Sequence, residues 1–136
     1  MTELARPRPA PDPYTAFFWS AAAEGRLEIQ RCATCGRWQY PPGVGCPACL
    51  GDELVPTPVS GRGTVYSFTV VRQAFDAAFI DHLPYVVALV SLEEDPAVRL
   101  ITNLVDVDPG AVTVGMPVEV AFLPVVDTAV PVFRPC

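Results

Sequence analysis

Lysine is absent from the 136-residue chain, and His82 is its single histidine. All nine basic residues are therefore arginine, set against fifteen acidic residues, and the net charge is −6. Residues 61–136 are the more acidic part, with four arginines and nine acidic residues. Because nucleic-acid binding depends on clustered lysine and arginine, this charge opposes a polyanionic partner.

Long apolar runs are absent too, since no stretch reaches the roughly 18 apolar residues that a membrane span requires. Residues 16–23 (AFFWSAAA) before Glu24 faintly imitate a signal peptide. This stretch is short, however, and four prolines stand in residues 7–13, where the apolar segment of a signal peptide would begin. We therefore expect a cytoplasmic protein that does not enter the membrane.

The motifs of common active sites are also missing. The chain has no phosphate-binding P-loop, no dinucleotide glycine motif and no G-x-S-x-G nucleophile elbow. His82 is a candidate general base. No serine or cysteine nucleophile surrounds it in sequence, and the adjacent Asp81 would point elsewhere on an extended chain. The sequence therefore predicts no catalytic residue.

The composition is that of a folded protein with more apolar residues than a domain of its size can bury. Hydrophobic residues make up 51% of the chain and charged residues 18%, which excludes a disordered chain. The length suits one domain or two small modules, and a chain of this size buries only about two-thirds of its unfolded surface. Some apolar side chains must remain exposed, which indicates contact with a partner, a ligand or a membrane.

Four cysteines form the strongest motif. Two C-x-x-C pairs, Cys32/Cys35 and Cys46/Cys49, are separated by ten residues. Each pair can hold one side of a tetrahedral ion, and thiolates suit Zn²⁺ or iron. The short separation predicts a compact, rubredoxin-like ribbon. Four thiolates leave no open position for water, so the metal is expected to be structural.

Other roles for these cysteines are possible. A disulfide framework is the main alternative, although it is unusual in the cytoplasm. A thiol redox site would need only one pair. Zinc is expected rather than iron because nothing else in the chain indicates electron transfer. The fifth cysteine, Cys136, is too distant along the chain to be assigned as a ligand.

A short helix is predicted before the ribbon. Asp12 can cap it, Pro13 suits its first position, and Gly25 can end it in the left-handed conformation. Its aromatic and alanine stripe packs either on the protein's own core or on another subunit; it consists of Tyr14, Phe17, Phe18, Ala21 and Ala22. The proline-rich segment upstream is typical of an extended, flexible lead.

Beyond Pro58 the pattern predicts five short strands. The first begins at Gly61–Gly63, with Tyr66, Phe68 and Val70 expected on one face. The others are expected at residues 85–92, 98–105, 118–123 and 129–133, the first of these being buried on both faces. Five strands without a long helix indicate a small closed barrel of the OB-fold type.

Residues 73–83 (QAFDAAFIDHL) interrupt the strand pattern. Phe75 and Phe79 lie in this excursion, beside Asp76, Asp81 and His82. An aromatic loop at a barrel rim can line a ligand passage. The alternative is that the loop simply packs its two phenylalanines on the barrel.

Five stretches spread over almost the whole chain combine these features. They are FFWSAAAEGRLEIQRCATCGRWQYPPGVGCPACL, SGRGTVYSFTVV, PYVVALVSLE, ITNLVDVDP and VGMPVEV. Over roughly residues 13–134 this combination resembles the acyl-CoA-associated OB-fold proteins with a rubredoxin-like zinc ribbon, long catalogued as domain-of-unknown-function family 35. The resemblance implies a mainly β fold with three parts: a lead and docking helix at residues 1–25, a zinc ribbon at 26–59 and a five-stranded OB-fold barrel at 60–136.

The resemblance also implies a setting beside another enzyme. Members accompany thiolase-like or lipid-transfer-protein-like enzymes, or hydratases of the MaoC type, that act on acyl-CoA thioesters. Some support steroid side-chain degradation, including a retro-aldol step performed by the thiolase-like partner. The resemblance implies Cys32, Cys35, Cys46 and Cys49 as metal ligands and no catalytic residues.

Three functions follow as hypotheses. The leading one is a non-catalytic accessory subunit, expected in a 2:2 complex with its enzyme because such partners have two-fold symmetry. In that setting Arg62, Arg72 and Arg99 are candidates for the CoA phosphates, and Phe75 and Phe79 for the acyl passage. The second is a nucleic-acid-binding module, using Tyr66, Phe68 and Phe133 for stacking; the acidic charge opposes it. The third is a stand-alone acyl-CoA enzyme that uses His82 or a carboxylate.

Overall fold

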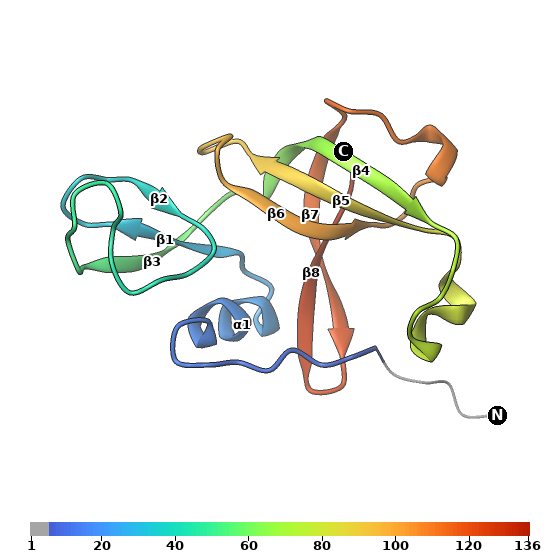
Figure 1. Cartoon of the computed structure of the whole chain (residues 1–136), viewed down its shortest axis with the longest axis horizontal. Coiled ribbons are helices and arrows are strands. Elements are labelled where there is room, and N and C mark those ends of the chain that lie inside the picture. The colour runs from blue at the N-terminus through green and yellow to red at the C-terminus, as the bar shows by residue number, and fades with distance from the viewer. Residues whose placement is uncertain (1–5) are drawn as a thin grey trace.

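The computed structural model describes residues 6–136 as a helix, a small sheet and a closed barrel (Figure 1). Helix α1 spans Ala16–Ala23. The small sheet contains β1 (Glu28–Cys32), β2 (Trp38–Gln39) and β3 (Leu54–Pro58), in the antiparallel order β2-β1-β3. The predicted fold class, mainly β with an N-terminal helix before a ribbon and a barrel, is confirmed.

The barrel follows the OB-fold strand order. Its strands are β4 (Arg62–Val71), β5 (Tyr85–Leu92), β6 (Arg99–Leu104), β7 (Pro117–Val125) and β8 (Thr128–Pro135). They close in the order β4-β5-β6-β8-β7, and all five were expected from the sequence. Two short 3₁₀ helices, η1 (Ala77–His82) and η2 (Pro109–Ala111), lie in connections between strands.

Closure of the barrel depends on two contacts between strands that are distant in sequence. Strand β4 pairs antiparallel with β7, and β6 meets β8 in the single parallel pairing, at Leu104 and Phe133. There the backbone N–H of Val105 donates to the carbonyl of Phe133 at 2.8 Å. The Phe133 side chain is fully buried and is the largest of the fully buried side chains in the core.

Helix α1 joins the small sheet to the barrel and packs against β8 and β1 (Figure 1). It begins at Ala16, three residues later than predicted, because Asp12 caps the preceding turn instead. The Asp12 carboxylate accepts from the backbone N–H groups of Tyr14 and Thr15 at 2.8 and 2.9 Å. Gly25 follows the helix with φ of 79°, as expected.

The aromatic stripe of α1 is divided between core and surface. Phe18, Ala21 and Ala22 are buried within this chain, and the Phe18 ring lies 5.9 Å from that of Tyr40. Packing on the protein's own core, the first of the two alternatives, therefore holds for these three residues. Tyr14 is exposed.

The predicted alternation along the first barrel strand is wrong at Tyr66. The register of β4 against β5 shifts between Val65 and Ser67, so one residue is inserted there as a β-bulge. Val65 consequently points into the core, while Tyr66 is 49% exposed. Phe68 and Val70, beyond the bulge, are both partly buried and pack against the core, which agrees with the prediction that they share one face.

The proline-rich lead runs extended along the barrel from Arg6 onward. The Arg6 guanidinium lies 5.1 Å from the Phe79 ring centroid and donates to the Asn103 side chain at 3.4 Å. Arg8 forms an ion pair with Asp127 at 3.1 Å. Burial lowers the pKa of Arg6. The first five residues of the predicted lead lie outside the described residues.

Within residues 6–136, every helix is too short or too polar to cross a bilayer.

Gly63 lets β4 approach β5 closely, and this gives a test of the barrel. A Cβ atom at this position would collide with the backbone carbonyl oxygen of Ser91. We expect Gly63→Ala to lower the free energy of unfolding by about 2 kcal/mol, because the strand pair must shift to accept the methyl group. Urea denaturation measures this.

Gly110→Ala is the matched control. The added Cβ would lie 3.5 Å from Asp108 Oδ1, an ordinary contact, and the stability should change by less than about 0.5 kcal/mol. Equal stability of the two variants would contradict the described β4–β5 approach.

Candidate functional site

The first cysteine pair lies on a turn at the end of β1. Cys32 is the last residue of that strand, and its backbone N–H donates to the Arg37 carbonyl at 2.8 Å. The Gly36 N–H donates back to the Cys32 carbonyl at 2.9 Å, and Gly36 has φ of 77°. Glycine tolerates this left-handed conformation, so the chain can fold tightly round Cys35.

The second pair lies on a matching turn outside the strands. The Leu50 N–H donates to the Cys46 carbonyl, and the Cys46 N–H donates to the Gly51 carbonyl, both at 2.8 Å. The side chain of Gln30 on β1 holds the loop before this turn. Its amide accepts from the Gly43 N–H at 2.9 Å and donates to the Gly43 carbonyl at 3.2 Å.

The two turns bring four sulfur atoms together. Their ligand atoms all lie within 4.8 Å of one another. The Sγ atoms of Cys32 and Cys49 are 3.5 Å apart, and those of Cys35 and Cys46 are 3.6 Å apart. Metal–sulfur bonds of about 2.3 Å in a tetrahedron place sulfurs about 3.8 Å apart. The arrangement therefore fits one four-coordinate ion.

The local electrostatics favours thiolates at two of the four positions. Backbone N–H groups, chiefly that of Cys35, lower the pKa of Cys32. The N–H of Cys49 is the main cause that lowers the pKa of Cys46 to about 6. At Cys49 the N–H of Gly51 is the largest single influence and acts in the same direction, but the sulfurs of Cys32, Cys35 and Cys46 together with desolvation outweigh it and raise the pKa of Cys49 to about 12. Full ionisation of the cluster thus requires a cation among the sulfurs.

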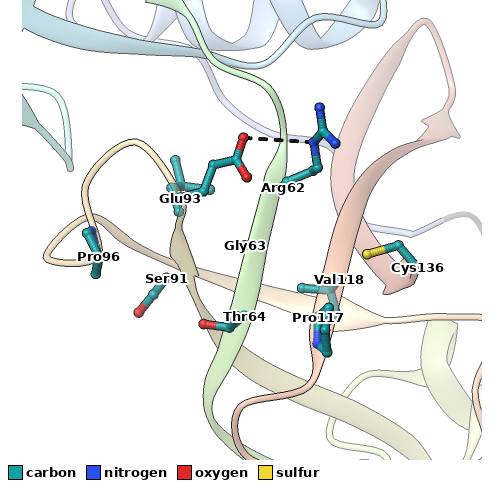
Figure 2. A pocket seen from close by; sticks show the side chains of 10 residues that line it. Arg62, Gly63, Thr64, Ser91, Glu93, Pro96, Pro117, Val118 and Cys136 are labelled. Atoms are coloured by element: carbon teal, nitrogen blue, oxygen red, sulfur yellow. Dashed lines mark ion pairs between the residues drawn. The ribbon is translucent and has the colours of Figure 1, made fainter.

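This centre is closed, as four protein ligands require. Cys32 and Cys46 are buried, and Cys35 and Cys49 are exposed, so one side of the centre faces the core of the ribbon and the other faces solvent. Cys136 is not part of the cluster. It lies at the end of the chain beside a surface pocket of about 320 Å³ (Figure 2).

Arg62, a candidate for CoA phosphates, lines the same pocket. Its Nε atom lies 3.8 Å from Oε1 of Glu93, an ion pair that Figure 2 marks with a dashed line. Arg62 begins β4 and Arg72 directly follows its last residue, so the two lie roughly 30 Å apart along the strand at about 3.3 Å per residue. Arg99 lies at the start of β6, with its guanidinium 3.9 Å from the Tyr66 ring centroid. The three arginines do not form a cluster.

The two phenylalanines of the 73–83 excursion have different environments. Phe79 is part of η1, and its ring lies 5.3 Å from that of Tyr85 and 6.5 Å from that of His82. Arg6 covers the same ring. Phe75 is 85% exposed. The packing alternative therefore describes Phe79, and Phe75 alone is free to meet a ligand or partner.

Sequence reasoning missed two residues that organise these regions. Gln30 holds the loop before the second cysteine turn, and Arg6, near the start of the chain, covers the Phe79 ring of the excursion. Both act on segments far from them in sequence, and no local pattern signals such a contact. His82 is exposed, and among the described residues no hydrogen bond involves its side chain.

The cysteine cluster gives a direct test. We expect the purified protein to contain one metal ion per chain and Cys46→Ser to lose it, because serine replaces a thiolate ligand. The variant should be destabilised by roughly 3 kcal/mol or more, since a small ribbon depends on its metal for folding. Elemental analysis and chemical denaturation measure both effects.

Cys136→Ser is the control for this experiment. It removes a cysteine outside the cluster and should keep the metal content and stability of the wild type. Metal loss in Cys136→Ser, or full metal content in Cys46→Ser, would contradict the assignment of the four ligands.

Two family profiles match the chain. The ChsH2 rubredoxin-like zinc ribbon domain matches residues 19–55, and the ChsH2 C-terminal OB-fold domain matches residues 56–123. The structure is similar to a solved chain described as "Ltp2-ChsH2(DUF35) aldolase", with a TM-score of 0.86 and 43% identity. The match covers 94% of this chain and 98% of that one.

Two curated relatives are longer proteins. A probable enoyl-CoA hydratase alpha subunit from Thermomonospora curvata is 44% identical over 131 residues, which are 96% of this chain and 40% of the relative. The 3-oxo-4,17-pregnadiene-20-carboxyl-CoA hydratase alpha subunit from Mycobacterium tuberculosis is 39% identical over 131 residues, 94% of this chain and 40% of the relative. This chain thus spans less than half of each.

Both profiles together cover most of the chain, and the solved relative matches 94% of it with a TM-score of 0.86. The chain therefore belongs to the ChsH2 (DUF35) family, in which a rubredoxin-like zinc ribbon precedes an OB-fold domain.

Proposed function

We propose that this protein is a non-catalytic accessory subunit of an enzyme that processes acyl-CoA thioesters in lipid or steroid side-chain metabolism. The observation that carries the proposal is the match to 98% of a solved chain whose description names an aldolase with two components, Ltp2 and ChsH2. The site supports a non-catalytic role. The cysteine centre has no open position, and the exposed His82 has no nucleophile bonded to it among the described residues.

The share of each relative that this chain matches supports a thiolase-like or lipid-transfer-protein-like aldolase as the partner, in preference to a MaoC-type hydratase. This chain corresponds to 98% of the aldolase component but only 40% of each hydratase subunit. The named hydratase activity can therefore belong to the part of those subunits that this chain does not match. The steroid thioester in the name of the Mycobacterium tuberculosis relative supports a bulky acyl-CoA as the substrate of the complex.

We also propose zinc as the resident ion of the four-cysteine centre, with Cys32, Cys35, Cys46 and Cys49 as its ligands. The all-thiolate donor set, the tetrahedral spacing and the match to a zinc ribbon profile support this. Zinc would supply no reaction chemistry in a closed site; these residues hold the ribbon together. Iron in place of zinc on elemental analysis would contradict the identity of the metal.

Contacts with the acyl-CoA itself are proposed for Arg72 and Phe75. Both are exposed at the barrel rim; Arg72 directly precedes the excursion, and Phe75 lies near its start. The other three candidates already have partners within the chain: Arg62 pairs with Glu93, Arg99 with Tyr66, and Phe79 with Arg6. A guanidinium that leaves such a contact for a phosphate loses the first interaction to gain the second.

The accessory role is tested by pull-down of the tagged chain from the lysate of its host, with mass spectrometry, followed by co-expression with the captured subunit. We expect mass spectrometry to identify a thiolase-like partner, and light scattering to give the mass of a 2:2 complex. Retro-aldol cleavage of a 3-hydroxyacyl-CoA should need the complex, and this chain alone should show none. A monomeric chain that leaves its host's thiolase-like subunits unbound would contradict the proposal. Co-purifying nucleic acid, detected by the 260/280 nm absorbance ratio, would favour the nucleic-acid alternative.

The acyl-CoA contacts are tested separately in that complex. We expect Arg72→Ala and Phe75→Ala each to raise the KM for acyl-CoA by about 5- to 10-fold, because each would remove roughly 1 kcal/mol of binding free energy. Arg62→Ala and Arg99→Ala are the matched controls and should change KM less than about twofold. Equal effects of the four variants would contradict the assignment to the excursion.

A further inference from the structure

The two cysteine turns of the ribbon have the same backbone design but different residues at one position. In each, the residue after the second cysteine donates its N–H to the carbonyl of the first, at 2.9 Å for Gly36 and 2.8 Å for Leu50. In each, that residue has a positive φ, 77° for Gly36 and 62° for Leu50. Glycine accepts this conformation freely, whereas leucine is strained in it. The chain thus carries leucine where its own equivalent turn carries glycine.

The backbone N–H of Leu50 is bonded within the turn, but its side chain gains no packing inside the chain that would favour leucine over glycine at this position. Its side chain is 87% exposed, more than any other large hydrophobic residue among those described. Val44, two residues before the second turn begins, is 69% exposed. The turn therefore presents an apolar side chain to solvent at an unfavourable backbone position, and the loop before it presents a second one at an ordinary position. Strain of this kind persists at sites where the side chain has a role outside the folded chain.

The acidic residues next to Leu50 indicate the charge that the binding surface of a partner must carry. Asp52 and Glu53 follow within three residues and are exposed. Neither is in any ion pair among residues 6–136. Acidic side chains at the rim of an apolar anchor favour a partner pocket that is apolar in its centre and basic at its edge.

Among residues 6–136, one other apolar residue combines positive φ with exposure. Val126, at the tip of the β7–β8 hairpin, has φ of 55° and is 72% exposed. The acidic residue beside it, Asp127, is already paired with Arg8 of the lead at 3.1 Å. That tip is thus an internal contact for the N-terminal segment, and its charge is satisfied within the chain. The second cysteine turn has no such internal partner.

We propose that Leu50, with the exposed Val44 of the preceding loop and with Asp52 and Glu53 after it in sequence, is the anchor by which the ribbon binds the acyl-CoA enzyme subunit. This rests on the accessory role proposed above and adds the surface that makes the contact. Leu50 enters an apolar pocket of the enzyme subunit, and basic residues at the edge of that pocket meet the two carboxylates. A few side chains in well-packed pockets that exclude water carry most of the binding free energy of an interface.

The experiment measures the Kd of the enzyme subunit identified by pull-down for variants of the full chain. Leu50→Asn removes the apolar group, and asparagine tolerates positive φ better than leucine. We expect its Tm to stay level or to rise by up to about 3 °C, its metal content to be unchanged, and its Kd to rise at least about tenfold. Leu50→Met keeps the apolar contact and should bind within about threefold of the wild type.

Val114→Asn is the matched control, since Val114 is also an exposed apolar loop residue, at 66%, without a positive φ. Its Kd should stay within about threefold of the wild type. Wild-type affinity in Leu50→Asn, or an equal loss in Val114→Asn, would overturn the assignment of the anchor and leave the accessory role intact. Absence of binding by the wild-type chain would instead overturn both.

Discussion

The convergence of four thiolates on one point is the constraint on which the ribbon depends. The ribbon has three short strands, one of them two residues long, and its strand residues are largely half-buried or exposed. Such a sheet cannot supply a sufficient hydrophobic core. The cluster sets the position of both turns. Strand β1, whose residues Ile29 and Cys32 are buried, connects the first turn to helix α1, and α1 packs on β8 of the barrel. A metal bound among the sulfurs would therefore stabilise the ribbon and, through β1 and α1, its attachment to the barrel.

The arginines show how little of the positive charge is available to a ligand. Arg6 covers Phe79, Arg31 lies 4.8 Å from the Trp38 ring centroid, and Arg99 covers Tyr66. Arg8, Arg26, Arg62 and Arg134 pair with carboxylates. A chain without lysine uses most of its guanidinium groups for internal stacking and pairing, so few remain to form a basic surface. This argues against a nucleic-acid platform more strongly than the net charge alone, because a binding groove needs several free cations on one face.

The features that sequence predicted well are those fixed by local chemistry. Ligand spacing at Cys32–Cys49, the buried strand at Tyr85–Leu92 and the helix end at Gly25 each depend on residues within a few positions of one another. The features it missed depend on contacts between distant segments. The bulge at Tyr66 is visible only against the register of β5, and Phe75 and Phe79 look alike in sequence until Arg6, about 70 residues earlier, is placed over one of them. The strain at Leu50 appears only when the two turns are compared as structures.

A protein whose role is to bind an enzyme has different requirements from an enzyme. It needs rigid side-chain placement at its contact surface and no reactive group of its own. In the accessory role proposed above, the same features of this chain would serve both requirements. The closed cysteine centre fixes the second turn without offering a coordination position, and the barrel fixes the rim from which Phe75 projects. Apolar side chains at these positions are unfavourable for an isolated chain but reduce the entropy lost on binding, since the backbone beneath them is already ordered. In the complex proposed above, the excess of hydrophobic residues over what a chain of this size can bury would have a use, because association would remove from water the apolar surface that folding leaves exposed.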